Sequence, residues 1–260
     1  MVVFISSYHI GIVLICIVES NNWYMKKGFL LIGFGICSYF TASAQWITGG
    51  PELGVNFSNL KTRVNGVNGN SESRVGLKFG GVLDIAIEDN FSIQPGLFYS
   101  VKGAKQDYIV STQNESGVIT THEIKNDYRI NYLEIPINFQ YKFGAHRSGQ
   151  FFIGGGPYLA IALGGKVTND DITIVDRPNG VSTVTDRSTE YNLRIGNNAN
   201  TDDVKKGDMG INLNLGYQFA GGLFLRGNLG LGLMNIMPGG DEDNYMRNNS
   251  FAVSIGYFLR

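Results

Sequence analysis

The sequence predicts an all-β protein: an eight-stranded antiparallel transmembrane β-barrel with short periplasmic turns and long extracellular loops. First, apolar residues alternate with small or polar residues at a period of two over eight segments, which is typical of strands with one apolar face. Second, short and long connections alternate between these segments, as they do in membrane barrels. Third, 17% of the residues are charged and 35 are glycine, whereas about 25% are charged in an ordinary soluble domain.

The strands are predicted over residues 47–58, 77–87, 91–102, 132–141, 151–163, 208–219, 223–233 and 250–259. In chain order, their alternating apolar positions are Leu53, Val55 and Phe57; Leu77, Phe79, Leu83, Ile85 and Ile87; Phe91, Ile93, Leu97, Tyr99 and Val101; Leu133, Ile135, Ile137, Phe139 and Tyr141; Phe151, Ile153, Leu159, Ile161 and Leu163; Met209, Ile211, Leu213, Leu215, Tyr217 and Phe219; Leu223, Leu225, Leu229, Leu231 and Leu233; and Phe251, Val253, Ile255, Tyr257 and Leu259.

The two faces of these strands predict which one meets lipid. The opposing positions are mostly Gly, Ala, Ser and Asn with few charges. That set is too small and too poor in charge for a solvated surface, so we expect it to fill a narrow interior while the apolar set faces lipid. A set of large side chains breaks the alternation: Val82, Phe98, Phe152, Tyr158 and Phe224.

The connections sort by length. The short ones are 88–90, 142–150 and 220–222, and the long polar ones are 59–74, 103–129, 164–207 and 237–247. Aromatic residues near the short turns are expected to form an interfacial girdle: Trp46, Phe91, Tyr141, Phe151, Tyr217 and Tyr257. Four prolines fall inside predicted strands, where we expect a belt of bulges at one height: Pro51, Pro95, Pro136 and Pro157.

The N-terminus has the layout of an export signal. Lys26 and Lys27 precede an apolar stretch, and a small-residue cleavage site precedes Gln45, in the order of a secretory signal peptide. We therefore expect residues 25–44 to be a signal peptide, 1–24 to be a mis-assigned upstream extension, and 45–260 to be the barrel domain. An N-terminal anchor helix is the alternative for the apolar stretch.

The cysteines and the charge balance exclude further classes. Cys16 and Cys37 both precede the cleavage point, so the mature chain is expected to hold no disulfide, thiolate metal site or cysteine nucleophile. The chain carries 21 Lys and Arg against 22 Asp and Glu, a formal net charge of −1. A nucleic-acid-binding surface needs a clustered basic excess, so we expect no nucleic-acid partner.

Charged residues at interior positions predict a structural network. They are Lys78, Asp84, Lys102, Glu134 and Arg226. Charges inside a barrel must be paired to offset the loss of hydration. We expect Glu134 and Asp84 to meet Lys78 and Arg226 across the lumen, and we expect this network to hold the barrel together rather than to catalyse a reaction.

No combination of residues predicts a catalytic, cofactor or metal site, so we expect no cofactor and no enzyme activity. His122, in a long loop, and His146, in a short turn, are expected at opposite ends of the barrel, which excludes a shared metal site or triad. Gly227, Gly230 and Gly232 lie inside a strand with no helix after them, unlike a dinucleotide-binding loop. Acidic loops could bind Ca²⁺, but their spacing is not that of an EF-hand and a solvated loop is the simpler interpretation: Asp170-Asp171, Asp202-Asp203 and Asp241-Glu242-Asp243-Asn244.

The chain resembles the outer-membrane β-barrel domain family of Bacteroidetes, the PorT-like or "porin family" small barrels. The resemblance covers residues 45–260 and implies a Gram-negative outer-membrane location without implying an activity. One departure is the end of the chain, Phe258-Leu259-Arg260, where many such barrels finish on an aromatic residue. The stretches that carry the resemblance are Gly54-Val55-Asn56-Phe57-Ser58, Gln94-Pro95-Gly96-Leu97-Phe98-Tyr99-Ser100 with Lys102-Gly103, Tyr132-Leu133-Glu134-Ile135-Pro136, Gly154-Gly155-Gly156-Pro157-Tyr158, Gly230-Leu231-Gly232-Leu233 and Ile255-Gly256-Tyr257-Phe258.

The expected function is that of a non-enzymatic integral outer-membrane protein that acts through its extracellular loops, in envelope interaction or in support of export. Its expected partners are outer-membrane lipid, the barrel assembly machinery and envelope or secretion proteins. Eight strands enclose an interior just wide enough for side chains, which disfavours a small-solute porin as the alternative. An exported soluble lipid-binding barrel is a further alternative, and a lipid-modifying enzyme would need a nucleophile and a base that the sequence does not offer together.

Overall fold

The computed structural model describes residues 47–69, 71–144 and 148–259. The predicted signal peptide and upstream extension, Trp46 and His146 lie outside these ranges. None of the described residues forms a helix long and apolar enough to cross a membrane. The described residues form ten strands: β1 (Ile47–Val64), β2 (Val67–Gly69), β3 (Glu72–Glu88), β4 (Phe91–Gln113), β5 (Ile119–Phe143), β6 (Gln150–Asp176), β7 (Ser182–Asn192), β8 (Gly207–Gln218), β9 (Leu223–Gly232) and β10 (Tyr245–Tyr257).

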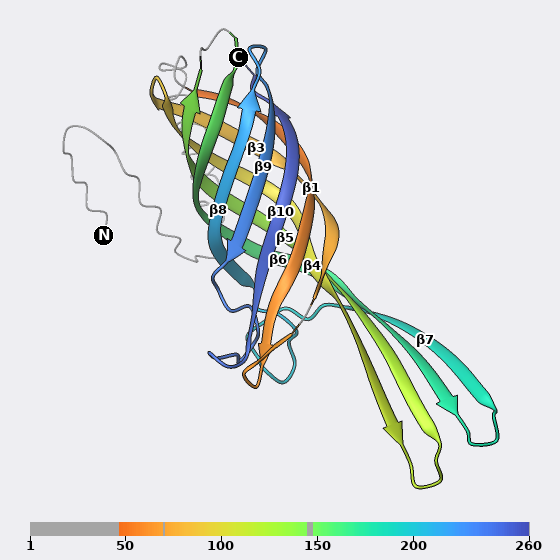
Figure 1. Ribbon diagram of the computed structural model, residues 1–260. Coiled ribbons are helices and arrows are strands. Elements are labelled where there is room, and N and C mark those ends of the chain that lie inside the picture. Colours follow the sequence, from red (N-terminus) through yellow and green to blue (C-terminus); the bar gives the residue numbers. More distant parts are fainter. Residues whose placement is uncertain (1–46, 70, 145–147, 260) are drawn as a thin grey trace, which may run out of the picture. The chain divides into compact units, whose positions relative to one another are not determined.

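Eight of these strands form a closed antiparallel ring. The order β10-β9-β8-β6-β5-β4-β3-β1 is closed by pairing of β1 with β10, in which Val55 lies opposite Val253. Strand β2 folds back on β1, and β7 pairs with β6 alone. Figure 1 shows the strands of the ring tilted around a common axis. The predicted all-β antiparallel ring is therefore confirmed, and closure removes the sheet edges that lipid cannot hydrate.

The predicted orientation of the two faces is confirmed on all eight strands of the ring, with one correction: Val101 of β4, expected on the outside, is only 6% exposed. In β8, Leu213 is 52% exposed on the outside, whereas Asn214 is 4% exposed and points inward. The large residues at interior positions are also buried inside the ring. Val82, Phe98, Phe152 and Phe224 form one cluster with Phe258, so the residues that break the alternation fill the lumen.

Aromatic side chains gather on the outside near the short turns. The rings of Phe151 and Tyr217 are 4.7 Å apart, and those of Tyr217 and Phe219 are 4.9 Å apart. On the neighbouring strand, Tyr141 and Phe143 make a similar edge-to-face contact at 4.8 Å. Aromatic rings of this kind favour the boundary between lipid and water.

Three of the four long connections, 59–74, 103–129 and 164–207, are strand for most of their length, which corrects the prediction, whereas 237–244 is a loop as predicted. Strands β4 and β5 run on as a hairpin to a turn at 114–118, and β6 and β7 form a second hairpin. Beyond Lys105 on β4 and Ile161 on β6, the pairing with β3 and β8 ends. Residues 105–128 and 166–192 therefore form a four-stranded sheet that extends past the ring, which we call the blade (Figure 1).

The prediction of bulges at the four prolines is wrong. The register shifts of the described strands lie at Ser73/Lys78, Ala86/Glu88 and Asn131/Tyr132. Instead, each proline interrupts the ladder with one neighbouring strand and leaves the register unchanged, because proline has no N–H to donate. The ladders skip the pairs that would contain Leu83 and Pro95, Gly96 and Pro136, Ile137 and Pro157, and Tyr257 and Pro51.

Candidate functional site: a filled interior and a projecting sheet

A buried carboxylate between two lysines forms the centre of the lumen. Glu134 of β5 lies 2.5 Å from Nζ of Lys102 and 3.7 Å from Nζ of Lys78. All three side chains are at most 7% exposed. The three residues come from β3, β4 and β5, whose interior positions lie side by side in the sheet. The structure thus brings Glu134 together with Lys78, as expected, and adds Lys102 to the pair.

Asp84 has a different partner from the expected one. It pairs with Nζ of Lys142 and accepts a hydrogen bond from Gln94 Nε2 at 2.9 Å. Lys78 lies on the same strand, six residues away, a distance of about 20 Å at 3.3 Å per residue. The expected contact of Asp84 with Lys78 or Arg226 is therefore not formed.

Arg226 of β9 also has a partner that the sequence analysis missed. Its Nη1 donates to Glu52 Oε2 at 2.9 Å and its Nη2 donates to Gln94 Oε1 at 2.6 Å. Ser254 donates to the other oxygen of Glu52 at 2.7 Å. Glu52 and Lys142 both stand at even-numbered, interior positions, so the alternation could have identified them. Gln94 links the Arg226 and Asp84 groups, since it contacts both.

Aromatic faces surround the buried cations. Nζ of Lys78 lies 4.3 Å from the ring centre of Phe98, and Nζ of Lys102 lies 4.5 Å from that of Tyr158. The guanidinium carbon of Arg226 lies 5.1 Å from the ring centre of Phe224. The negative face of an aromatic ring attracts a cation, most strongly where water is excluded. The aromatic rings therefore stabilise the buried cations, as water would at an exposed site.

An apolar cluster and a connecting segment close the hairpin end of the lumen. Tyr132, Tyr158 and Ile130 pack there against Leu193, Val204 and Ile236. Residues 193–206, which we call the cap segment, connect β7 to β8 and are fixed by backbone hydrogen bonds to their neighbours, including Lys205 N–H to Ile236 O at 2.7 Å. Interior side chains and the cap segment thus fill the ring.

The remaining candidate residues have partners of their own. His122 lies in β5, not in a loop, with Nδ1 3.2 Å from Asp171 Oδ1 and 3.1 Å from Thr173 Oγ1. Asp203 pairs with Arg194 at 2.8 Å, and Asp241 accepts hydrogen bonds from its own turn. Among the described residues, no group of three or more His, Cys, Asp and Glu side chains could hold a metal ion.

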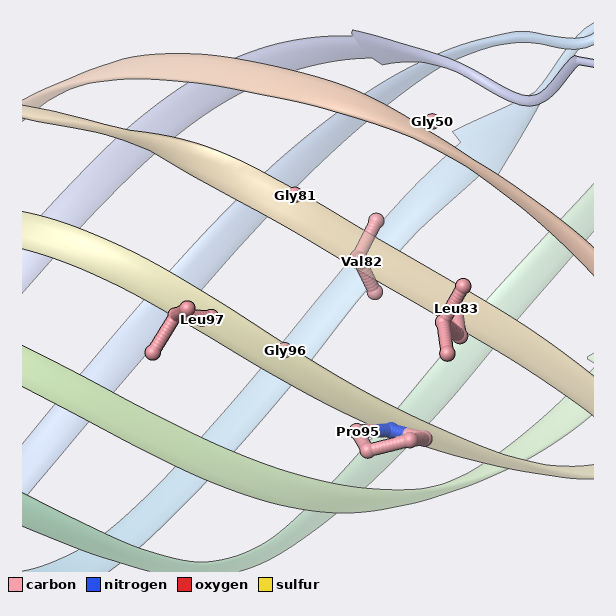
Figure 2. Close-up of a pocket in the computed structure, with 7 residues that line it drawn as sticks. All are labelled: Gly50, Gly81, Val82, Leu83, Pro95, Gly96 and Leu97. Carbon is pink, nitrogen blue, oxygen red and sulfur yellow. The ribbon is translucent and has the colours of Figure 1, made fainter. Parts of the chain in front are cut away.

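The outer face of the ring carries a shallow groove beside Pro95, where β1, β3 and β4 lie next to one another. Figure 2 shows Gly50, Gly81 and Gly96 side by side on β1, β3 and β4, with Pro95 and two leucines around them. The groove has a volume of about 400 Å³ and is almost wholly apolar. It arises because Gly81 stands at an outward position where its neighbours carry large side chains.

The blade is a single layer with both faces uncovered. On one face Ile109 is 68% exposed and Val184 is 64% exposed, and on the other Tyr108 is 47% exposed. Cross-strand pairs such as Lys166 with Glu190 at 2.5 Å and Ser188 with Asp170 at 2.5 Å run across it. The described residues provide no second layer for it, so its apolar side chains are available to a partner.

Several solved structures resemble this chain in outline. The attachment invasion locus protein Ail of Yersinia pestis matches with a TM-score of 0.34 and 10% identity, over 82% of this chain and 98% of that one. Neisserial surface protein A matches with a TM-score of 0.34 and 11% identity, over 81% and 96%. The N-terminal barrel domain of Pseudomonas aeruginosa OprF matches with a TM-score of 0.27 and 9% identity, over 81% and 99%. No curated protein matches the chain.

A match to a protein family assigns the chain to the outer membrane. The model of the family described as "Outer membrane protein beta-barrel domain" matches residues 44–237, which include seven of the eight ring strands. The outward apolar face and the closed ring agree with that match. The chain therefore belongs to the outer membrane protein beta-barrel domain family and is a protein of the outer membrane.

Proposed function

We propose that this protein is a non-enzymatic barrel with a closed interior, which acts at the cell surface by contact through its blade. The observation that carries the proposal is the contrast between the two candidate sites. Lys102, Glu134 and Arg226 are at most 4% exposed inside the ring, whereas the blade exposes large apolar side chains on both faces. A filled lumen leaves contact through the blade as the activity that this geometry supports best.

We also propose how the chain reaches the membrane, which side of it each end of the barrel faces, and which group of bacteria it comes from. Residues 25–44 direct export, the short turns at 89–90 and 219–222 face the periplasm, and the blade lies outside the cell. The stretches around Pro95, Pro136 and Pro157 support a place among the PorT-like small barrels of Bacteroidetes, which are Gram-negative. The proposed partners are outer-membrane lipid, the barrel assembly machinery and envelope or secretion proteins.

Labelling on intact cells tests the orientation. We expect a membrane-impermeant maleimide to label Val184→Cys in the blade and not Asn90→Cys in the turn between β3 and β4. The wild-type chain gives the background of Cys16 and Cys37. Labelling of Asn90→Cys and not of Val184→Cys would reverse the orientation and overturn the surface role.

A channel for small solutes is the alternative function. The purified protein in a planar bilayer should show no steady single-channel conductance, because apolar clusters and the cap segment fill the ring. A reproducible conductance in the wild-type protein would overturn the closed interior and favour a channel. The two experiments are independent, since a conducting barrel could still expose its blade.

A further inference from the structure

The blade has two free edges in the part of the chain that the structure describes. Strand β7 pairs with β6 on one side, and β4 beyond Lys105 pairs with β5 on one side. The backbone N–H and C=O groups on the other side of each edge can pair with a further strand. Proteins commonly protect such edges with charges, prolines or bulges.

The two edges differ in that protection. Asp186 and Arg187 stand in the middle of β7, and Glu190 stands in its part nearest the ring. The run Tyr108-Ile109-Val110-Ser111-Thr112 of β4 carries no charge, proline or glycine and consists mostly of residues that favour strands. Residues 107–113 of β4 are all exposed. The β4 edge is therefore the one open to strand addition.

We propose that the free β4 edge pairs in antiparallel fashion with the same edge of a second copy of this protein, with Ile109 at the two-fold axis. This register pairs residues Gln106 to Thr112, which lie beyond the last pair of β4 with β3, with the same residues of the second copy. It is chosen because each residue of this length then lies opposite a compatible one.

The self-pairing opposes compatible residues throughout. Ile109 meets Ile109, and Tyr108 meets Val110, an aromatic and β-branched pair of the kind that stabilises sheets. The one charge in this free length also meets a neutral residue, since Asp107 faces Ser111. No like charges stand opposite each other, which is the main penalty in cross-strand pairing. This charge compatibility favours a second copy over an unrelated strand.

The direction of β4 decides where the second copy must lie. Strand β4 runs from the short turn at its start, through the ring, to the tip of the blade. Antiparallel pairing therefore places the two rings at opposite ends of one continuous eight-stranded sheet. Because the ring belongs to an outer membrane, the second copy lies in a facing membrane. The inference rests on the proposed surface location of the blade and makes the protein a homotypic link between two outer membranes.

Cysteine crosslinking tests the contact. Opposite Cα atoms in an antiparallel pair are about 4.5–5.5 Å apart, which is within the range of a disulfide. Cells that carry Ile109→Cys with one of two epitope tags are mixed and oxidised, and we expect disulfide-linked dimers that contain both tags. Val184→Cys, similarly exposed on the other edge, should give none. Dimers that form only when one cell makes both tagged chains would overturn the facing arrangement.

A charge exchange tests the two-fold axis in a second way. Vesicles that contain Ile109→Lys should aggregate about tenfold more slowly than wild type, and so should vesicles with Ile109→Glu, because like charges then meet at the axis. A mixture of the two should aggregate at close to the wild-type rate. If the mixture aggregates as slowly as each variant alone, and the mobility of unboiled samples shows that both variants are folded, self-pairing is overturned. If Val184→Cys is still labelled from outside the cell, the proposed surface function survives that failure.

Discussion

Glu134 and Lys102 lie 2.5 Å apart inside the ring, and each side chain is 3% exposed. Lys78 approaches the same carboxylate at 3.7 Å from the neighbouring strand. One negative charge thus joins two positive charges across three strands. Removal of the carboxylate would leave both lysines buried without an anion, and a buried charge without a partner strongly destabilises the folded state.

We therefore expect Glu134→Ala to destabilise the barrel by about 3 kcal/mol. Urea unfolding in detergent, followed by the gel mobility of unboiled samples, measures this loss. The matched control is Glu190→Ala in the blade, whose pair with Lys166 is about half exposed on both sides. An exposed pair contributes about 0–1 kcal/mol. Equal stability of Glu134→Ala and wild type would contradict a structural role for the network.

The buried ion pair of Glu52 and Arg226 should show energetic coupling between its two residues. Glu52→Gln leaves Arg226 without its anion, and Arg226→Met leaves Glu52 without its cation, so each single change should destabilise the fold. The double variant should lose less than the sum, with a coupling of about 1–3 kcal/mol. The same urea titration on all four proteins closes the cycle. Additive losses would show that Ser254, not Arg226, satisfies Glu52.

The alternation along the strands predicted the fold because a membrane barrel separates its two faces completely. The contrast between Leu213 and Asn214 can be read from the sequence since one faces lipid and the other a narrow lumen. The same alternation predicted which charged residues lie in the interior. It did not predict their partners, because the stagger between strands decides whether Asp84 meets Lys142 or Arg226, and that stagger is not encoded in any one segment.

The blade could not be predicted in the same way. Its strands are uncovered on both faces, so Ile109 and Tyr108 are adjacent and no period of two appears. The strand-favouring run in 108–112 was the available signal, and it lay inside a segment whose polar composition resembled a loop. The prolines misled for another reason, since Pro95 interrupts the ladder with β3 without moving the register.

Adjacent glycines of β3 should respond in opposite ways to the same substitution. A Cβ on Gly80 would lie 2.1 Å from Leu97 O, whereas a Cβ on Gly81 would have Gly50 O as its nearest neighbour at 3.7 Å. We expect Gly80→Ala to destabilise by about 1–3 kcal/mol through overpacking. Gly81→Ala should stabilise by about 0.4–1 kcal/mol, because it restricts the unfolded chain.

Urea titration of these two variants beside wild type measures both effects. Gly81→Ala also reduces the outer groove, so it tests whether the groove contributes to stability. A loss of stability in Gly81→Ala comparable with that in Gly80→Ala would show that the groove at Pro95 requires a bare backbone.

The cap segment should loosen in acid. Burial raises the pKa of the Asp203 carboxyl, but hydrogen bonds from the Arg194 guanidinium and from its backbone N–H more than offset this and hold the pKa below its ordinary value. The unfolded segment therefore binds a proton more readily than the folded one. The stabilisation is complete above the unfolded pKa of about 3.9 and is lost as the pH falls through the lower folded value.

A nitroxide on Asn200→Cys should thus keep a constant mobility from neutral pH to about pH 5 and become more mobile below about pH 4. The control is Asp203→Asn in the same labelled chain, which lacks the carboxylate and should be mobile at every pH. The barrel itself should stay folded over this range, as unboiled gel mobility will show. A label whose mobility changes equally in both chains would assign the transition to another group of the segment.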